Sequence, residues 1–182
     1  MDFTVIKIPQ NRVGVLIGPE GKTKQEIEDR SNVKIYIDSE SGEVTLDESK
    51  AFEPIVALKV RDVVRALGRG FSPEHAFRLF QDDMYLEVLD LSDFVGKDKK
   101  DMERVRARLI GTNGKTRRTI EEDTGVNMAI FGKTVSVLGE INEVQAAREA
   151  VVMILEGAPH SAVYKFLERR RKELRLQELG LE

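Results

Sequence analysis

Two glycines followed by a cluster of cations form the stretch of this sequence best suited to bind phosphate. Gly111 and Gly114 are separated by two residues, and Lys115, Arg117 and Arg118 follow at once. Two glycines let the chain turn tightly and let a phosphate group approach the backbone. The helix expected after them begins with unpaired N–H groups and a positive dipole end. We therefore expect phosphates to bind against this loop and the start of the next helix.

The same pattern occurs earlier in the chain. Residues 17–37 and 110–130 align at a constant offset of 93, and nine of the 21 aligned positions are identical. The identical pairs are Ile17/Ile110, Gly18/Gly111, Gly21/Gly114, Lys22/Lys115, Thr23/Thr116, Ile27/Ile120, Glu28/Glu121, Val33/Val126 and Ile37/Ile130. An internal repeat indicates repeated structural units. Two modules of about 70 residues each are therefore expected in the chain.

Other chemistries find little support in the residue types. A P-loop needs a glycine five positions before the glycine of Gly-Lys-Thr, and Leu16 and Leu109 stand there instead. The chain has no cysteine, and its two histidines, His75 and His160, have no serine or acidic partner at a recognisable spacing. We therefore expect no enzyme activity, no metal site and no cofactor.

Charge is distributed unevenly along the chain. The formal net charge is −3, although nucleic-acid-binding domains often carry a basic excess. Residues 97–118 nevertheless hold nine Lys or Arg against three Asp or Glu, and residues 4–25 hold four against one, giving +6 and +3. Both glycine loops can thus be positive on an acidic body. Neither a bilayer-spanning apolar run nor a signal peptide is recognisable, which predicts a cytoplasmic protein without membrane contact.

Periodicity and turn residues predict the elements of the first module. They are a strand at 3–8, a short helix at about 10–17, a helix at about 22–31, strands at 33–38 and 43–46, and a long helix that begins near Pro54 and ends at Gly68 and Gly70. Asn32 and its repeat mate Gly125 should each close a helix in the left-handed conformation. The long helix should bury one face, made of Phe52, Val56, Val60, Val63 and Leu67.

Residues 71–83 indicate a short connecting helix with Ser72 as N-cap. The second module should then contain a strand at 84–90, helices at about 98–109 and 115–124, strands at 126–131 and 134–138, and a helix at 143–156. Asn142 with Gln145 approximates a capping box for that last helix. A tail helix should follow, with Ser161 as N-cap and with packing residues Val163, Phe166, Leu167 and Leu174. Its basic run, 168–175, is either a solvated face or a face that contacts RNA.

The glycine loop, with its flanking apolar and basic positions, resembles the KH module, which binds single-stranded nucleic acid. In that module a Gly-x-x-Gly loop joins two helices and clamps about four backbone nucleotides. The order strand, helix, helix, strand, strand, helix is that of the eukaryotic type, or type I. The resemblance implies an α+β fold with two tandem type I KH domains, each a three-stranded antiparallel sheet packed on three helices. The expected boundaries are 1–67 for the first domain, 68–83 for the connecting segment, 84–157 for the second domain and 158–182 for the C-terminal helix.

Functional residues carry over from the KH resemblance position by position. In the second module the expected RNA-binding residues are Arg106, Arg108, Ile110, Gly111, Thr112, Asn113, Gly114, Lys115, Arg117 and Arg118. A secondary set in the first module is Ile17, Gly18, Gly21, Lys22 and Lys24. Some of these cations can serve solubility alone. Apolar residues near the loop are expected in the core, although the resemblance places a few of them on the floor of the groove; these are Ile110, Ile120, Val126 and Met128.

The two loops should differ in affinity for RNA. Pro19 lacks an N–H group, and Glu20 places a negative charge where a phosphate would bind. Thr112 and Asn113 keep their N–H groups and add neutral polar side chains. We expect the second module to bind RNA more strongly and the first to serve mainly in docking or protein contact.

Two further segments, GFSPEHAFRLF at 70–80 and GAPHSAVYKFLERRRKEL at 157–174, narrow the resemblance. They look like parts of one double-KH family, the ribosome-assembly proteins of archaea and eukaryotes called partner of Nob or Dim-two, which are related to the Krr-type factors. This resemblance implies single-stranded RNA binding near the 3′ end of small-subunit ribosomal RNA, alongside the PIN-domain endonuclease that trims that end. In archaeal relatives it also implies contact with the alpha subunit of initiation factor two.

The sequence departs from the eukaryotic relatives in two ways that favour an archaeal source. They tend to have lost the first glycine loop, whereas Gly18 and Gly21 are intact, and their long charged N-terminal extension is absent here. We expect a non-catalytic adaptor that holds single-stranded ribosomal RNA. Two alternatives stay open: a protein–protein scaffold with vestigial KH modules, and a general messenger-RNA or exosome-type RNA binder.

Overall fold

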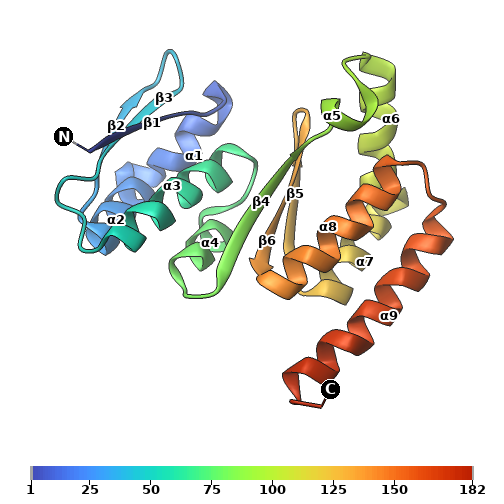
Figure 1. Ribbon diagram of the computed structural model, residues 1–182. Coiled ribbons are helices and arrows are strands. Elements are labelled where there is room, and N and C mark those ends of the chain that lie inside the picture. Colours follow the sequence, from blue (N-terminus) through green and yellow to red (C-terminus); the bar gives the residue numbers. More distant parts are fainter. Residues whose placement is uncertain (1, 182) are drawn as a thin grey trace. The chain divides into compact units, whose positions relative to one another are not determined.

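The computed structural model describes residues 2–181, which fall into two compact units that divide between Asp82 and Asp83 (Figure 1). Residues 68–82 belong to the first unit, and the C-terminal helix belongs to the second. Each unit contains a three-stranded sheet with helices packed on it.

The first unit begins with the predicted order of strands and helices. Its elements are β1 (Phe3–Lys7), the 3-10 turn η1 (Gln10–Arg12), α1 (Val13–Ile17), the 3-10 turn η2 (Pro19–Gly21), α2 (Lys22–Ser31), β2 (Lys34–Asp38), β3 (Glu43–Asp47), α3 (Pro54–Gly68), α4 (Pro73–Ala76) and the 3-10 turn η3 (Phe77–Phe80). The helix expected at 10–17 is therefore a 3-10 turn followed by a short α-helix.

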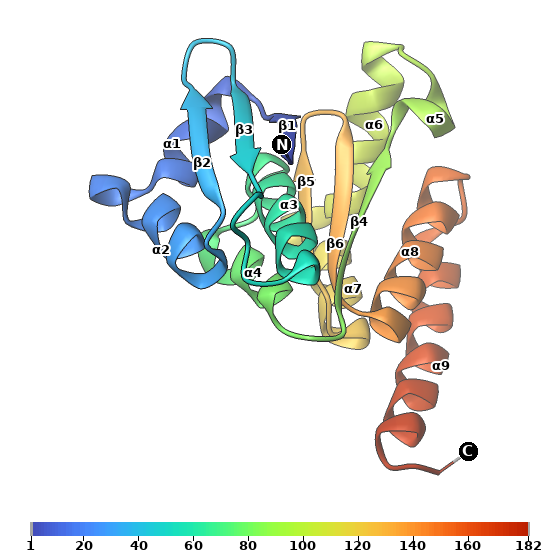
Figure 2. The ribbon, with the colours of Figure 1, turned by 60° about the vertical axis from the view of Figure 1, so that its left-hand side comes forward.

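Strand β3 lies at the centre of the first sheet, whose order is β1-β3-β2 with both pairs antiparallel. Figure 2 shows β2 and β3 joined by a turn. Val44 of β3 stands opposite Ile6 of β1 and Ile37 of β2. Val44 is fully buried, as are Leu16 of α1 and Ile27 of α2. The strand alternation and the helix periodicity thus point their apolar residues into one core.

The long helix buries only part of the face predicted for it. Val60, Val63 and Leu67 are fully buried, but Val56 is half-buried and Phe52 is 64% exposed. The prediction for Phe52 was wrong because the helix begins at Pro54, after the extended N-cap residue Glu53. Phe52 therefore precedes the helix and does not share its periodicity.

The connecting segment packs on the first unit. The hydroxyl oxygen of Ser72 accepts a 3.3 Å hydrogen bond from the backbone N–H of His75, which confirms Ser72 as an N-cap. The rings of Phe77 and Phe80 lie 5.9 Å apart. The guanidinium carbon of Arg30, on α2, lies 5.1 Å and 5.4 Å from the centres of these two rings.

The second unit repeats the order of the first and adds two helices. Its elements are β4 (Met84–Asp90), α5 (Ser92–Val95), α6 (Lys99–Ile110), the 3-10 turn η4 (Thr112–Gly114), α7 (Lys115–Thr124), β5 (Asn127–Phe131), β6 (Thr134–Glu140), α8 (Ile141–Leu155) and α9 (His160–Glu178). The one-turn helix α5 was not predicted. The sheet order β4-β6-β5 places β6 between two antiparallel neighbours, as β3 is in the first unit.

A single apolar cluster holds the second unit together. It includes Leu109 of α6, Ile120 of α7 and Ile154 of α8, all fully buried. Helix α9 packs against α7 and α8 and contributes Val163 and Leu167. These two residues confirm the packing face expected of the tail, and Phe166 is partly buried against the same cluster, whereas Leu174 is half-exposed further along the helix.

Two predicted helix caps of the second unit were wrong. Helix α8 begins two residues earlier than expected, so its capping box is formed by Glu140 and Glu143 and not by Asn142 with Gln145. The N-cap of α9 is Pro159, with the helix starting at His160, so Ser161 is already inside the helix. Each unit nevertheless shows the strand, helix, helix, strand, strand, helix order, which confirms the α+β class and the type I arrangement.

Candidate nucleic-acid interface

The second glycine loop has a backbone that only glycine adopts easily at its first position. Gly111 has φ 75° and ψ 173°, a conformation essentially restricted to glycine. A Cβ atom built on it would collide with Thr116 Oγ1 and lie 2.7 Å from the Thr116 backbone nitrogen. Asn113 and Gly114 follow with φ 53° and 74°. The loop therefore folds back tightly onto the first turn of α7.

Three amides of this loop are occupied by the protein's own carbonyls. The N–H of Gly111 donates to Ala107 at 2.8 Å, that of Gly114 to Gly111 at 3.2 Å, and that of Lys115 to Thr112. Within residues 2–181, no backbone acceptor is recorded for the N–H groups of Thr112 and Asn113, and both residues are exposed. The expectation of unpaired N–H groups for phosphate at this loop thus holds for Thr112 and Asn113 and is wrong for the two glycines.

The first loop has the same shape but offers fewer amides. Gly18, Glu20 and Gly21 have φ 74°, 54° and 73°, and the N–H groups of both glycines again donate to backbone carbonyls. Pro19 has no N–H, which leaves only that of Glu20. The Glu20 carboxylate also lies 3.4 Å from the ammonium of Lys22, so part of that charge is balanced. In the described part of the chain, the first loop therefore has one backbone amide without a protein acceptor where the second loop has two.

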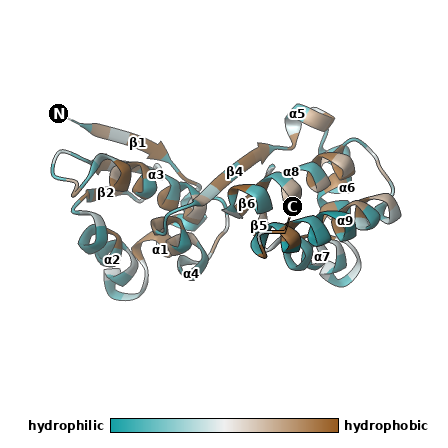
Figure 3. Ribbon diagram, turned by 60° about the horizontal axis from the view of Figure 1, so that its bottom comes forward, coloured by the Kyte–Doolittle hydropathy of each residue, from teal (hydrophilic) through white to brown (hydrophobic). Residues whose placement is uncertain are grey.

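Cations at the start of α7 are exposed beside the loop. Lys115, Arg117 and Arg118 all face solvent. Arg118 donates from Nη1 to the Asn113 carbonyl oxygen at 2.9 Å, which holds its charge over the loop. Arg117 lies 3.7 Å from the Glu121 carboxylate, so part of its charge is balanced. Helix α7 is drawn mainly in hydrophilic colours in Figure 3, in keeping with a solvent-facing helix.

Two arginines expected at the RNA surface are partly buried in α6. Arg108 donates to the carbonyl oxygens of Ile154, at the end of α8, and of Ala158, in the turn that follows, so its guanidinium is bound within the protein. The Nε atom of Arg106 is buried and has no hydrogen-bond partner among the described residues. The structure therefore does not favour an RNA contact by Arg108, because its guanidinium already donates to two backbone carbonyls.

Of the apolar residues near the loop, three are in the core as expected. Ile120, Val126 and Met128 are at most 2% exposed, whereas Ile110 is 39% exposed at the end of α6. The prediction that Ile110 lies in the core was wrong because the chain turns at Gly111 and leaves its side chain at the surface. Ile17 in the first unit is half-buried. Ile110 is thus an exposed apolar side chain directly before the second glycine loop.

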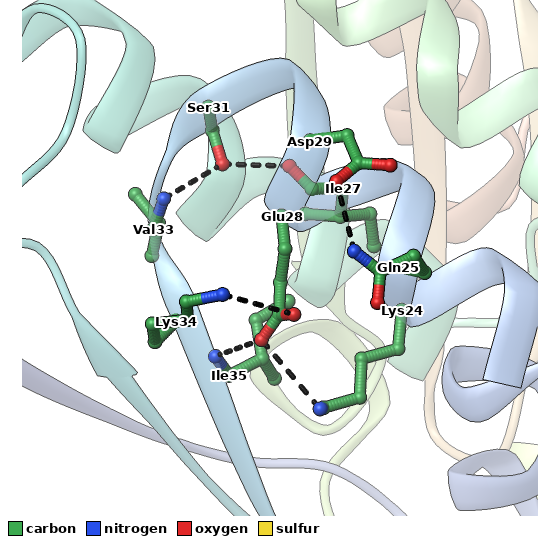
Figure 4. A network of polar contacts seen from close by, with 9 residues as sticks. All are labelled: Lys24, Gln25, Ile27, Glu28, Asp29, Ser31, Val33, Lys34 and Ile35. Carbon is green, nitrogen blue, oxygen red and sulfur yellow. Dashed lines mark hydrogen bonds and ion pairs between the residues drawn. The ribbon is translucent and has the colours of Figure 1, made fainter.

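A glutamate brace ties the second helix to the next strand in each unit. In the first, Glu28 Oε1 accepts a 2.9 Å hydrogen bond from the backbone N–H of Ile35 and lies 3.5 Å from the Lys24 ammonium (Figure 4). In the second, Glu121 Oε1 accepts from Met128 N–H, also at 2.9 Å. Sequence reasoning missed this role, although Glu28 and Glu121 are identical in the repeat. Lys24, expected to bind RNA, is half-buried and paired.

Sequence comparisons assign the chain to a family. A model of the eukaryotic type KH domain (KH-domain type I) matches residues 85–172, and a KH-domain model matches residues 3–52. A KH domain-containing protein of Methanocaldococcus jannaschii is 45% identical over 171 residues, which cover 94% of this chain and 75% of that protein. The RNA-binding protein pno1 of Dictyostelium discoideum is 27% identical over 161 residues, covering 87% of this chain and 67% of that protein.

A solved structure agrees with these matches. In the crystal structure of the a/eIF2alpha–aDim2p–rRNA complex of Pyrococcus horikoshii, the matching chain is 44% identical, with a TM-score of 0.88, and the match covers 94% of this chain and 95% of that one. The chain belongs to the Dim2/Pno1 family. The family expected from the motifs, partner of Nob or Dim-two, is thereby confirmed.

The basic run of α9 is largely balanced in this Dim2/Pno1 protein. Arg170 lies 2.8 Å from Glu173, Arg171 lies 3.2 Å from Asp123 of α7, and Lys172 lies 3.5 Å from Glu168. Three cations of the run are thus paired with carboxylates, which favours the solvated face over a continuous RNA-binding face.

Other site types find no support in the described part of this Dim2/Pno1 chain. Among residues 2–181, no three His, Cys, Asp or Glu side chains are placed to hold a metal ion. The helices of that same range are all too short or too polar to cross a membrane.

Proposed function

We propose that this protein is a non-catalytic adaptor that binds single-stranded RNA through its second KH domain, at the 3′ region of small-subunit ribosomal RNA during maturation. As a member of the Dim2/Pno1 family, it is an RNA-binding protein of ribosome biogenesis. The observation that carries the proposal is the pair of exposed amides at Thr112 and Asn113, next to the cations of α7.

The two amides and the cations suit the edge of a polynucleotide. Backbone N–H groups at the start of a helix donate hydrogen bonds to phosphate oxygens, and the helix dipole adds a favourable potential. Lys115 and Arg118 add full charges next to the loop, and Arg117 adds a charge that Glu121 partly balances. Contacts of this kind position the strand without reading its sequence. We assign sequence discrimination to base contacts beside the loop, with Ile110 as the exposed apolar residue.

The ribosomal RNA target and the partners rest on relatives. The aDim2p complex of Pyrococcus horikoshii contains both ribosomal RNA and a/eIF2alpha, and that chain is similar to this one over 94% of its length. We therefore propose the alpha subunit of initiation factor two as a protein partner. We propose that it binds the first KH domain, because Pro19 leaves the glycine loop of that domain with one backbone amide fewer for RNA. The PIN-domain endonuclease is proposed as a second partner on the family resemblance alone.

A loop-charge experiment tests the proposal on the full chain. Thr112→Asp with Asn113→Asp places two negative charges beside the exposed amides, and both residues are exposed, so unfolding should be little affected. Titration of a labelled oligonucleotide from the 3′ region of small-subunit ribosomal RNA should show loss of binding by the variant. Pro19→Asp in the first loop, next to Glu20, is the matched control and should bind nearly as the parent does. Equal binding by all three proteins would contradict the proposal.

A second oligonucleotide separates the alternatives. A scrambled RNA of the same length should bind the parent protein more weakly than the ribosomal sequence. Equal affinities would favour a general RNA binder. Binding of a/eIF2alpha without any binding of RNA would favour a protein scaffold with vestigial KH domains.

A further inference from the structure

Tyr164 of the C-terminal helix lies against the first turn of α7. Its hydroxyl oxygen is 2.9 Å from Thr116 Oγ1, and the Lys115 ammonium nitrogen is 5.4 Å from the centre of its ring. Both partners are the residues that directly follow the second glycine loop. One aromatic side chain from α9 therefore touches the two residues that join the loop to its helix.

Thr116 connects Tyr164 to the loop itself. The threonine side chain is 1% exposed and packs against Gly111, where a Cβ atom would collide with its Oγ1. The hydrogen bond between this hydroxyl and that of Tyr164, in which either group can donate, fixes the threonine rotamer from the other side. The conformation of the glycine loop is thus supported by a chain of contacts from Tyr164 through Thr116 to Gly111.

The ring of Tyr164 is itself held in place. His160, one helical turn earlier, stacks on it with ring centres 6.0 Å apart and an interplanar angle of 17°. The Nε2 atom of His160 lies 2.9 Å from the carbonyl oxygen of Arg108, three residues before the loop. Residues i and i+4 share one face of a helix, so this face of α9 points toward the loop.

The lysine that directly follows the glycine loop has different partners in the two domains. Lys22 of the first loop pairs with Glu20 at 3.4 Å, whereas no ion pair is recorded for Lys115 within residues 2–181. An aromatic face attracts an ammonium group without neutralising it, so the charge remains available to a phosphate. Thr23 also packs against Gly18, as Thr116 does against Gly111, but no aromatic hydroxyl is recorded against it in the described part of the first unit.

We propose that Tyr164 is a positioning residue of the RNA site: it holds the unpaired Lys115 beside the loop and locks Thr116 against Gly111. This inference rests on the proposed RNA binding of the second domain. It gives the C-terminal helix a role in that site that its basic run does not supply.

The experiment is a double-mutant cycle on the full chain. Tyr164→Leu removes the ring and the hydroxyl, Lys115→Gln removes the charge, and the double variant removes both. Binding of single-stranded RNA is measured at several salt concentrations. Tyr164→Leu should weaken binding by roughly two- to fivefold, the range of an exposed cation–π contact. The double variant should show the same salt dependence as Lys115→Gln alone, because the ring acts on the salt dependence only through the Lys115 charge, whereas a further loss of affinity reports the lost contact with Thr116.

The salt dependence separates positioning from a general loss of structure. Loss of one phosphate contact lowers the slope of log affinity against log salt by about 0.7 for a single strand. Both single variants should lower it by a similar amount. Phe166→Leu, on the same helix and against the same core but without a contact to the loop, is the matched control and should keep the parent slope. Tyr164→Phe keeps the aromatic ring, so its binding should keep the salt dependence of the parent protein. This variant tests the role of the ring even when Tyr164→Leu folds poorly.

Three outcomes would overturn the inference: an unchanged salt dependence in Tyr164→Leu, additive losses of salt dependence in the double variant, or a Tyr164→Phe variant whose salt dependence falls as that of Tyr164→Leu does. Failure of the proposed function looks different, because then the parent protein and the Thr112→Asp, Asn113→Asp variant bind RNA equally. If the parent binds through the loop while Tyr164→Leu behaves as the parent does, only the role of Tyr164 is refuted.

Discussion

Arg108 donates a hydrogen bond of 2.7 Å from Nη1 to the carbonyl oxygen of Ile154. In the first unit Arg12 donates from Nε to the carbonyl oxygen of Leu67, also at 2.7 Å. Ile154 and Leu67 are each the last residue but one of the long helix that follows the third strand of their domain. Arg108 stands three residues before its glycine loop and Arg12 stands six before its own. The two domains therefore close the same helix end with arginines from different sequence positions.

Replacement of Arg108 should affect stability rather than RNA binding. Arg108→Ala removes the hydrogen bonds to the carbonyls of Ile154, at the end of α8, and of Ala158, in the following turn, which should lower the free energy of unfolding by about 1–3 kcal/mol. Denaturant unfolding measures this, and RNA titration at a temperature where the variant is folded should give nearly the parent affinity. Arg104→Ala, which loses only an exposed ion pair with Asp101, is the control and should change stability by less than about 0.5 kcal/mol. A large loss of RNA affinity with an unchanged free energy of unfolding would show that Arg108 contacts RNA.

The two glycines of the second loop should tolerate alanine differently. Gly111→Ala forces a glycine-only conformation, at about 1–3 kcal/mol, and also brings a Cβ against Thr116. Gly114 has a left-handed helical conformation with no atom nearer than 3.8 Å to a built Cβ, so Gly114→Ala should cost only about 1–2 kcal/mol. Thermal unfolding of the full chain compares them. Equal melting temperatures would show that the contact between the loop and Thr116 is not as tight as described.

An ion pair in the first unit should make stability depend on acid pH. Arg61 donates from Nε to Glu48 Oε1 at 2.7 Å, and this hydrogen bond holds the pKa of the Glu48 carboxyl below its ordinary value. A carboxyl whose pKa is lower in the folded state stabilises the protein above its unfolded pKa, about 4.3 for Glu, and the benefit is lost as pH falls through the folded value. Glu48→Gln should therefore lower the melting temperature at pH 7 and make little difference at pH 3.

An exposed ion pair supplies the control for that measurement. The pKa of Asp82 is also lowered, by a hydrogen bond from Lys59, but its side chain is 94% exposed. Asp82→Asn should change the melting temperature little at either pH. A difference for Glu48→Gln that persists undiminished at pH 3 would mean that packing, and not the charge, accounts for its effect.

Local signals in the sequence were enough to predict most boundaries of helices and strands. Asn32 and Gly125 end the second helices with φ 55° and 92°, as predicted from the preference of these residues for the left-handed conformation. Helix α2 spans 22–31 as predicted, and the shape of both glycine loops follows from the positions of their glycines. Each of these features is set by residues within one or two turns of each other, so the printed sequence contains the information.

The contacts that define the site are mostly long-range and could not be predicted. Arg108 meets Ile154 across 46 residues, and Tyr164 meets Thr116 across 48. No periodicity indicates which charged side chain folds inward when several lie on one helix. The identity of Glu28 and Glu121 was a usable signal, because a glutamate kept at the same position in both copies of a repeat indicates a structural partner. Its partner, a strand N–H group seven residues ahead, is not visible in residue types.

Amide chemical shifts measure the central claim most directly. The full chain, labelled with ¹⁵N, is titrated with a single-stranded oligonucleotide from the 3′ region of small-subunit ribosomal RNA, and every backbone N–H signal is followed. The account predicts that the signals of Thr112 and Asn113 shift most and in proportion to binding, while that of Glu20 in the first loop shifts little. Binding that leaves the Thr112 and Asn113 signals in place, with the largest shifts elsewhere, would contradict it.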